Sequence, residues 1–303
     1  MSNRYGITIP FDTPLGEQKD LYKEFADLGY TDLWSSEADG ADGFTPLILA
    51  SQWAPELRLG VAIIPAYTRG PALMAQNIAS MCDAAPGRFV MGIGSSSNVI
   101  VEHWNGIAFN EPYKRTRDMV HFLRKALAGE KVTEEYEGFE VNGFTLRRVP
   151  SEQPPILIAA LREGMLRLAG RDGDGAIINW LSADDVSTVK PYVDEGGAEK
   201  EIVARIFCCP NPDADVVRAG AKRAIAAYLN VPVYAEFHRW LGRSEDLDGM
   251  WKAWAAGDRK AALEAIPDHV VDQLIVHGDA QTCREHIDRY LSLIHISEPT
   301  RPY

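Results

Sequence analysis

The hydrophobic positions of the chain fall into short apolar runs, each followed by a helix-like pattern. In the first third of the chain these runs begin near Tyr5, Thr31, Leu57 and Arg88. They are continuously apolar rather than alternating, which is typical of parallel strands that protein covers on both faces. The pattern predicts repeated βα units, arranged as a barrel or as a doubly wound sheet.

The middle of the chain interrupts this repeat. A helical pattern that ends near Leu127 is followed by an alternating stretch containing the pair Asn142 and Gly143, which predicts a β-hairpin insertion. An aromatic-rich helical block over residues 228–278 is expected to cap the mouth of a barrel. Between the two insertions the repeat resumes, and three further apolar runs bring the predicted parallel strands to seven: residues 154–161, 175–182 and 201–209.

Composition narrows the function classes. The 303 residues are enough for one (β/α)8 barrel, which needs roughly 250. The net charge of −12 argues against nucleic acid or an anionic membrane as a partner and favours a small-molecule substrate. The four cysteines have no metal-ligand or disulfide spacing, so we expect no metal and a cytoplasmic location. No apolar run reaches the roughly 18 residues of a membrane span, and the first ten residues lack the core of a signal peptide.

The fourth apolar run, "GRFVMGIGSSS", ends in bare backbone and hydroxyl groups. Gly92 and Gly94 have no side chain to keep a ligand away, and Ser95, Ser96 and Ser97 add hydrogen-bond donors. A flat molecule with a polar edge would suit such a strand end. The alternative is an ordinary Gly-Ser turn into the next helix. The motif has neither the Gly-Lys-Ser of a phosphate-binding loop nor the spacing of a dinucleotide fingerprint.

Several segments together carry a resemblance to a known family. They run in order from residue 5 to about residue 290: "YTDLWSSEADGADGFTPL", "LRLGVAIIPAYTRGPALMAQ", "APGRFVMGIGSSS", "PPILIAALREGMLRLAGRDGDGAIINWLS" and "VHGDAQTCREHI". The chain resembles the luciferase-like monooxygenase superfamily, and within it the oxidoreductases that depend on the deazaflavin coenzyme F420. The resemblance implies an α/β fold, a (β/α)8 TIM barrel whose C-terminal mouth holds a flavin or deazaflavin, often in a homodimer.

The resemblance also implies an activity. We expect an oxidoreductase that transfers hydride between coenzyme F420 and a small organic substrate. Two alternatives stay open: an FMN-dependent monooxygenase, and a barrel that binds a flavin without catalysis. Both kinds of ring share this scaffold.

The implied cofactor contacts lie at strand ends. The resemblance places the loop Gly94–Ser97 beside the cofactor, Ser36 near its ring, and a cis peptide bond between Ala62 and Ile63 under the ring. A helix N-terminus near Ser182 is expected to receive the cofactor's phosphate, and the alternative is a plain capping serine. Five further candidates complete the cofactor set: Ala159, Ala160, Asn179, Trp180 and Leu181.

Two residues are candidates for catalysis. Glu37 occupies a family position that approaches the ring, so we expect a general acid or base, or a residue that orients substrate. Its alternative role is a carboxylate at a helix N-terminus. His103 lies on a loop that could reach over the substrate, and its alternative is a solvated loop histidine.

The last thirteen residues depart from the family pattern. The barrel domain is expected over residues 1–290. Residues 291–303, "LSLIHISEPTRPY", resemble the translation of a sequencing adapter, so we expect a non-native tail and a missing eighth strand. We also expect residues 292–296 to stand in for that strand beside the first or the seventh.

Overall fold

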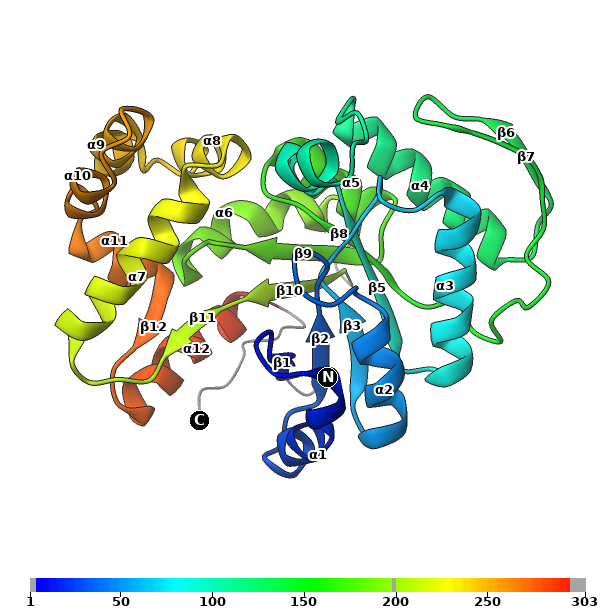
Figure 1. Ribbon diagram of the computed structural model, residues 1–303, viewed down its shortest axis with the longest axis horizontal. Helices are drawn as coiled ribbons and strands as arrows, with labels where there is room; N and C mark the ends of the chain where they lie inside the picture. The colour runs from blue at the N-terminus through cyan, green and yellow to red at the C-terminus, as the bar shows by residue number, and fades with distance from the viewer. Residues whose placement is uncertain (1–3, 198–199, 295–303) are drawn as a thin grey trace.

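The computed structural model describes residues 4–197 and 200–294. Its main sheet has the order β1-β2-β3-β5-β8-β9-β10, with every neighbouring pair parallel, and it curls into an open barrel (Figure 1). The predicted α/β fold with seven parallel strands is therefore confirmed. These strands, with the short β4 (Ile64–Pro65) beside β5, are β1 (Gly6–Thr8), β2 (Asp32–Ser35), β3 (Arg58–Val61), β5 (Phe89–Gly94), β8 (Ile156–Ala159), β9 (Gly175–Asn179) and β10 (Glu201–Arg205).

Helices cover the outer face of the sheet, as the continuously apolar strands require. Their apolar sides pack with the outward strand positions into the main core, in which Leu33, Leu59 and Ile178 are at most 1% exposed. A 3-10 turn, η1 (Leu15–Glu17), precedes the first helix. The helices are α1 (Lys19–Asp27), α2 (Thr45–Trp53), α3 (Pro71–Ala84), α4 (Pro112–Leu127), α5 (Glu163–Arg171), α6 (Ala183–Asp194) and α12 (Ala280–Leu293).

Both predicted insertions are present. β6 (Val132–Glu135) and β7 (Glu140–Phe144) form an antiparallel hairpin whose turn spans residues 136–139. The pair Asn142 and Gly143, which predicted the turn, lies inside β7 instead, where Gly143 has a φ of 73° at a shift in the register of the two strands, as a β-bulge does. The helical block lies at the opposite end of the molecule (Figure 1) and has a core of its own, which includes Trp180 and Leu247. It consists of α7 (Ala214–Leu229), α8 (Pro232–Trp240), α9 (Ser244–Ala255), α10 (Arg259–Glu264) and α11 (Asp268–Leu274).

A second, shorter sheet continues beyond the barrel strands. β11 (Phe207–Cys209) follows β10 and pairs in parallel with β12 (Ile275–His277), which comes directly after the helical block. The sequence pattern predicts one strand over residues 201–209. The structure divides it at Ile206, so that its first half pairs with β9 and its second half with β12.

β1 and β10 are the two edges of the main sheet within the described residues. The expectation that residues 292–296 form a strand there is wrong for its first half, because Ser292 and Leu293 belong to α12. Tyr290 fixes this helix by donating a hydrogen bond from its hydroxyl to the Leu181 carbonyl at 2.9 Å. Residues 295–303 lie outside the described residues, and the suspected adapter origin of the tail stays a prediction.

Charged side chains join the two edges at the amino ends of the strands. Asp32 is fully buried and accepts hydrogen bonds from Arg4 and from the Arg58 guanidinium. Arg58 also pairs with Glu201 at the start of β10. Three strands that are distant in sequence are thereby tied across the floor of the barrel. None of the helices in the described ranges is long and apolar enough to cross a membrane.

Candidate functional site

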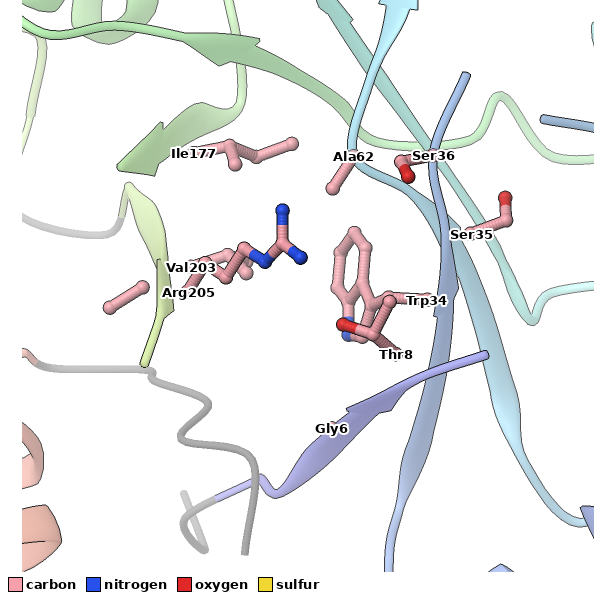
Figure 2. A pocket seen from close by; sticks show the side chains of 10 residues that line it. Gly6, Thr8, Trp34, Ser35, Ser36, Ala62, Ile177, Val203 and Arg205 are labelled. Atoms are coloured by element: carbon pink, nitrogen blue, oxygen red, sulfur yellow. The ribbon is translucent and has the colours of Figure 1, made fainter. Parts of the chain in front are cut away.

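A small pocket lies inside the barrel toward the carboxyl ends of the strands (Figure 2). Open βα structures bind ligands at this end because the loops that follow the strands converge there. The pocket is predominantly apolar and carries a few polar groups, as small-molecule sites do. It is lined by Gly6, Thr8, Trp34, Ser35, Ser36, Ala62, Ile177, Val203, Ala204 and Arg205.

Trp34 forms the floor of the pocket. Its indole belongs to a separate cluster inside the barrel, together with Leu157, Ile177 and Val203. Gly60 on the neighbouring strand makes this possible, because a Cβ on Gly60 would collide with the indole. Side chains alternate along a strand, so the inward positions two residues further on, such as Asn179 and Arg205, face the mouth.

The bond between Ala62 and Ile63 is a cis peptide bond, as the resemblance implies. The Ala62 N–H donates to the Ser35 carbonyl at 2.7 Å, and the Ile63 carbonyl accepts from the Glu37 N–H at 3.3 Å. Both hydrogen bonds tie this bond to the end of β2. Ala62 lines the pocket next to Ser36, so two members of the predicted cofactor set are brought together there.

Gly94 has a packing role that the sequence did not reveal. A Cβ at this position would lie 2.8 Å from Ala159 Cβ and 3.3 Å from Ile63 Cδ1. The glycine therefore lets β5 approach its neighbours, and it brings Gly94, Ile63 and Ala159 together around the inner cluster.

The three serines after Gly94 are partly exposed and lie outside the described pocket lining. Ser96 has φ 63°, a left-handed conformation that is uncommon for a residue with a Cβ. The Ser97 hydroxyl accepts a long hydrogen bond, 3.4 Å, from the Ile100 N–H at the start of the π-helix η2 (Val99–Trp104). The loop thus has a defined turn, and its place beside the cofactor stays a prediction.

Glu37 is held by three groups. Its carboxylate pairs with Arg69 at 2.6 Å and accepts hydrogen bonds from the Thr68 hydroxyl at 3.1 Å and the Gly43 N–H at 3.2 Å. These contacts link the loops after β2 and β4. The alternative role, a carboxylate at a helix N-terminus, belongs instead to Asp42, which accepts from two N–H groups at the start of α2.

The three candidates at the end of β9 separate from one another. Asn179 donates from Nδ2 to the Tyr234 hydroxyl at 3.1 Å, and its Oδ1 is buried without a hydrogen-bond partner among the described residues. Trp180 has φ 55°, which turns its side chain into the helical block, where it stacks on Phe207 with ring centroids 3.9 Å apart. Leu181 is 2% exposed. Only Asn179 keeps a position facing the mouth.

The N-terminus of α6 is closed by its own residues. The Ser182 hydroxyl and the Asp185 carboxylate form a reciprocal capping box, and Arg243 donates to Asp185 at 2.8 Å. Ser182 is 4% exposed and Asp185 is 8% exposed. The structure therefore supports the plain capping serine here rather than a site for a phosphate, because a buried carboxylate already fills the position.

Two further candidates lie away from the pocket. His103 is an exposed residue of η2 and is outside the lining, within the part of the chain that the structure describes. Ala160 is 2% exposed, and its N–H donates to the Ile177 carbonyl at 3.0 Å, so it serves the packing of the sheet. No group of three metal-ligating side chains was found among the described residues.

Sequence reasoning missed Arg205 and Thr8 in the pocket wall. The signal for Arg205 was available in the run "EIVAR". Val203 is an inward residue of a strand, so Arg205 has to face the same side, at the end of the strand where the site lies.

The fold and the pocket define a class of protein, a barrel of βα units with a small-molecule site at the carboxyl ends of its strands. The chain belongs to the luciferase-like monooxygenase family, whose model matches residues 3–294.

Individual relatives agree with this assignment. The 5,10-methylenetetrahydromethanopterin reductase of Archaeoglobus fulgidus is 27% identical over 300 residues, which cover 94% of this chain and 89% of that protein. The F420-dependent glucose-6-phosphate dehydrogenase of Rhodococcus hoagii is 30% identical over 243 residues, 78% of this chain and 69% of the relative. Among solved structures, the F420-dependent tetrahydromethanopterin reductase of Methanopyrus kandleri superposes with a TM-score of 0.81 at 20% identity, covering 99% of this chain and 93% of that one.

Proposed function

We propose that this protein is an oxidoreductase that transfers hydride between coenzyme F420 and a small organic substrate. The observation that carries the proposal is the predominantly apolar pocket at the carboxyl ends of the strands, lined by Trp34, Ser36 and Ala62, in a chain whose relatives include F420-dependent enzymes. An FMN-dependent monooxygenase is the alternative, because the family is named for monooxygenases. A barrel that binds a flavin without catalysis is the third outcome of the tests below.

The residues at the mouth fit a flat ring with a polar edge. The pocket's apolar walls suit the faces of a ring, and its few polar groups suit an edge. The buried Asn179 Oδ1 lacks a hydrogen-bond donor among the described residues, and a ring N–H would supply one. Ala62, Ile63, Gly94 and Ala159 would hold one face of the ring, and Ser36 and Asn179 its edge.

In this proposal the bound coenzyme supplies the carbon that gives or accepts the hydride. The chain's own residues bind and orient. Trp34 and Ile177 keep water out of the floor of the pocket, which strengthens electrostatic interactions above them. Glu37, held by Arg69, is a positioning residue that fixes the backbone around Ile63. His103, in η2, stays a candidate catalytic residue.

Binding and turnover test the proposal separately. Coenzyme F420 and FMN are titrated into the full chain, and binding is followed by quenching of the fluorescence of each ring. We expect tighter binding of F420. Reduced F420 is then incubated with small aldehydes and ketones, and the return of the oxidised absorbance is measured under anaerobic conditions. Binding of FMN and not of F420, with oxygenated product formed when reduced FMN, oxygen and substrate are supplied together, would establish the monooxygenase. Binding without turnover of either ring over a broad substrate panel would support the non-catalytic barrel.

A homodimer, a small-molecule substrate and a cytoplasmic location complete the proposal. The relatives act on small molecules according to their names. Light scattering of the purified chain tests the dimer.

A further inference from the structure

Arg205 brings a positive charge into the apolar pocket. It is the last residue of β10, two positions after the inward Val203. Figure 2 shows its guanidinium directed into the pocket, toward the side of Trp34 and Ala62. A charged side chain is costly against apolar walls unless a group of opposite charge accompanies it.

No carboxylate of the described residues lies within 4 Å of this guanidinium. The guanidinium carbon lies 5.0 Å from the centroid of the Phe207 ring, and the positive charge also acts on the uncharged phenol of Tyr234. A cation–π contact stabilises the cation without neutralising it. The charged groups at the floor of the barrel differ, since Arg58 is paired with both Asp32 and Glu201. Arg205 therefore has donors to offer to a ligand.

The negative charge of the whole molecule makes a local cation important for binding an anion. A net charge of −12 repels small anions from the surface, whereas a local cation attracts them within a screening length of about 8 Å. Thr8 and Ser36 line the same pocket with hydroxyl donors. A guanidinium beside two hydroxyls and an aromatic floor suits an oxyanion that carries an uncharged body.

We propose that Arg205 binds the carboxylate or phosphate of the substrate, so that the substrate class is small organic anions. The guanidinium would hold the oxyanion through paired N–H donors, and the uncharged part of the molecule would lie against Trp34. The assignment of this anion as a substrate rests on the proposed function, whereas the binding of an anion by Arg205 is independent of that function.

Two matched probes test the site, para-fluorobenzoate and its neutral counterpart para-fluorobenzamide. Their affinities for the full chain are measured by fluorine NMR titration. We expect the wild type to bind the carboxylate at least about tenfold more tightly, as one charge-assisted contact implies. Arg205→Gln should remove the preference, and Arg205→Lys should retain part of it. Arg284→Gln, on the exposed face of α12, removes the same charge far from the pocket and should keep the full preference. Circular dichroism confirms that each variant is folded.

Several outcomes overturn the proposal. A wild type without preference for the carboxylate rejects it, as does a preference that survives in Arg205→Gln. Coenzyme F420 is also an anion, so its affinity is measured for the same proteins. If Arg205→Gln weakens F420 binding as much as benzoate binding, the arginine serves the cofactor and the substrate assignment is wrong. A wild type that binds benzoate through Arg205 but binds no F420 keeps the anion site and rejects the proposed function.

Discussion

The contacts of Glu37 distinguish a general acid or base from a residue that positions the surrounding loops. Both of its carboxylate oxygens have partners, and the closest is the guanidinium of Arg69, with 15% of each side chain exposed. A general acid or base needs a free path to the reacting atom. The observed contacts favour a residue that holds the loops around the Ala62–Ile63 bond.

Replacement of Glu37 tests this distinction. Glu37→Gln should destabilise the fold by about 1–3 kcal/mol, because it leaves Arg69 with only the more distant carboxylate of Asp42, 3.9 Å away. Turnover of reduced F420 should fall while the pH profile of kcat keeps its shape, and Glu37→Asp should restore part of the activity. The profile is measured on all three proteins. Loss of one limb of the profile in Glu37→Gln alone would instead make Glu37 the general acid or base.

The serine loop gives a second prediction at the residue scale. Ser95→Leu should weaken cofactor binding at least about tenfold with the barrel still folded, because loops at the carboxyl ends of strands tolerate change better than the core does. Fluorescence titration with F420 measures the effect. Ser96 is unsuitable for the same change, since its φ of 63° disfavours a bulky side chain.

Ser96→Gly is therefore the matched control for Ser95→Leu. Glycine adopts the left-handed conformation without steric cost, so this variant should fold at least as stably as the wild type. Cofactor affinity that is unchanged in Ser95→Leu would exclude the loop from the site.

At the scale of elements, α8 and the turn before α9 carry a buried polar group into the helical block. His238 is fully buried, and burial, together with the charge of Arg243, lowers its pKa to about 4. Arg243 itself pairs with Asp185 at the start of α6 and so connects the block to the barrel. A histidine that stays neutral in the folded protein makes stability depend on pH.

The direction of this dependence follows from the lowered pKa. In the unfolded chain His238 is protonated as the pH falls through about 6.5, whereas in the folded chain it is protonated only near pH 4. Its contribution is complete above pH 6.5 and is lost as the pH falls to 4, by about 2–3 kcal/mol at pH 4.5. Urea unfolding at pH 7.5 and pH 4.5 measures it. His238→Phe should lose less stability between the two pH values than the wild type. An equal loss in both proteins would assign the dependence to other groups.

At the scale of the whole molecule, the ion pairs among Arg4, Asp32, Arg58 and Glu201 join the edges of the open sheet at the amino ends of its strands. Arg58 reaches from β3 to Asp32 on β2 and to Glu201 on β10. Arg58→Met should destabilise the protein by about 3–5 kcal/mol, because the fully buried Asp32 loses a partner. Arg58→Lys should lose less. Chemical unfolding measures both, and a loss below about 1 kcal/mol for Arg58→Met would show that the floor does not hold the barrel together.

The sequence by itself determined the strands, their parallel arrangement, the hairpin and the helical block. These features depend on local periodicity, which a run such as "GAIINWLS" carries within a few residues. The resemblance added the barrel and the cis bond at Ala62–Ile63. The resemblance also assigned Ser36 and Ala62 to one site.

Only the tertiary structure decided what each side chain of the site faces. The positive φ of Trp180 directs its ring into the helical block, and Arg69 forms an ion pair with the Glu37 carboxylate. Arg243 donates a hydrogen bond to Asp185 in the capping box of α6, 58 residues away in the sequence. Such pairings depend on long-range packing and on conformations that no local pattern specifies. Periodicity could have placed Arg205 on the inner face, but the absence of a described carboxylate beside it was visible only once the strands were closed around the pocket.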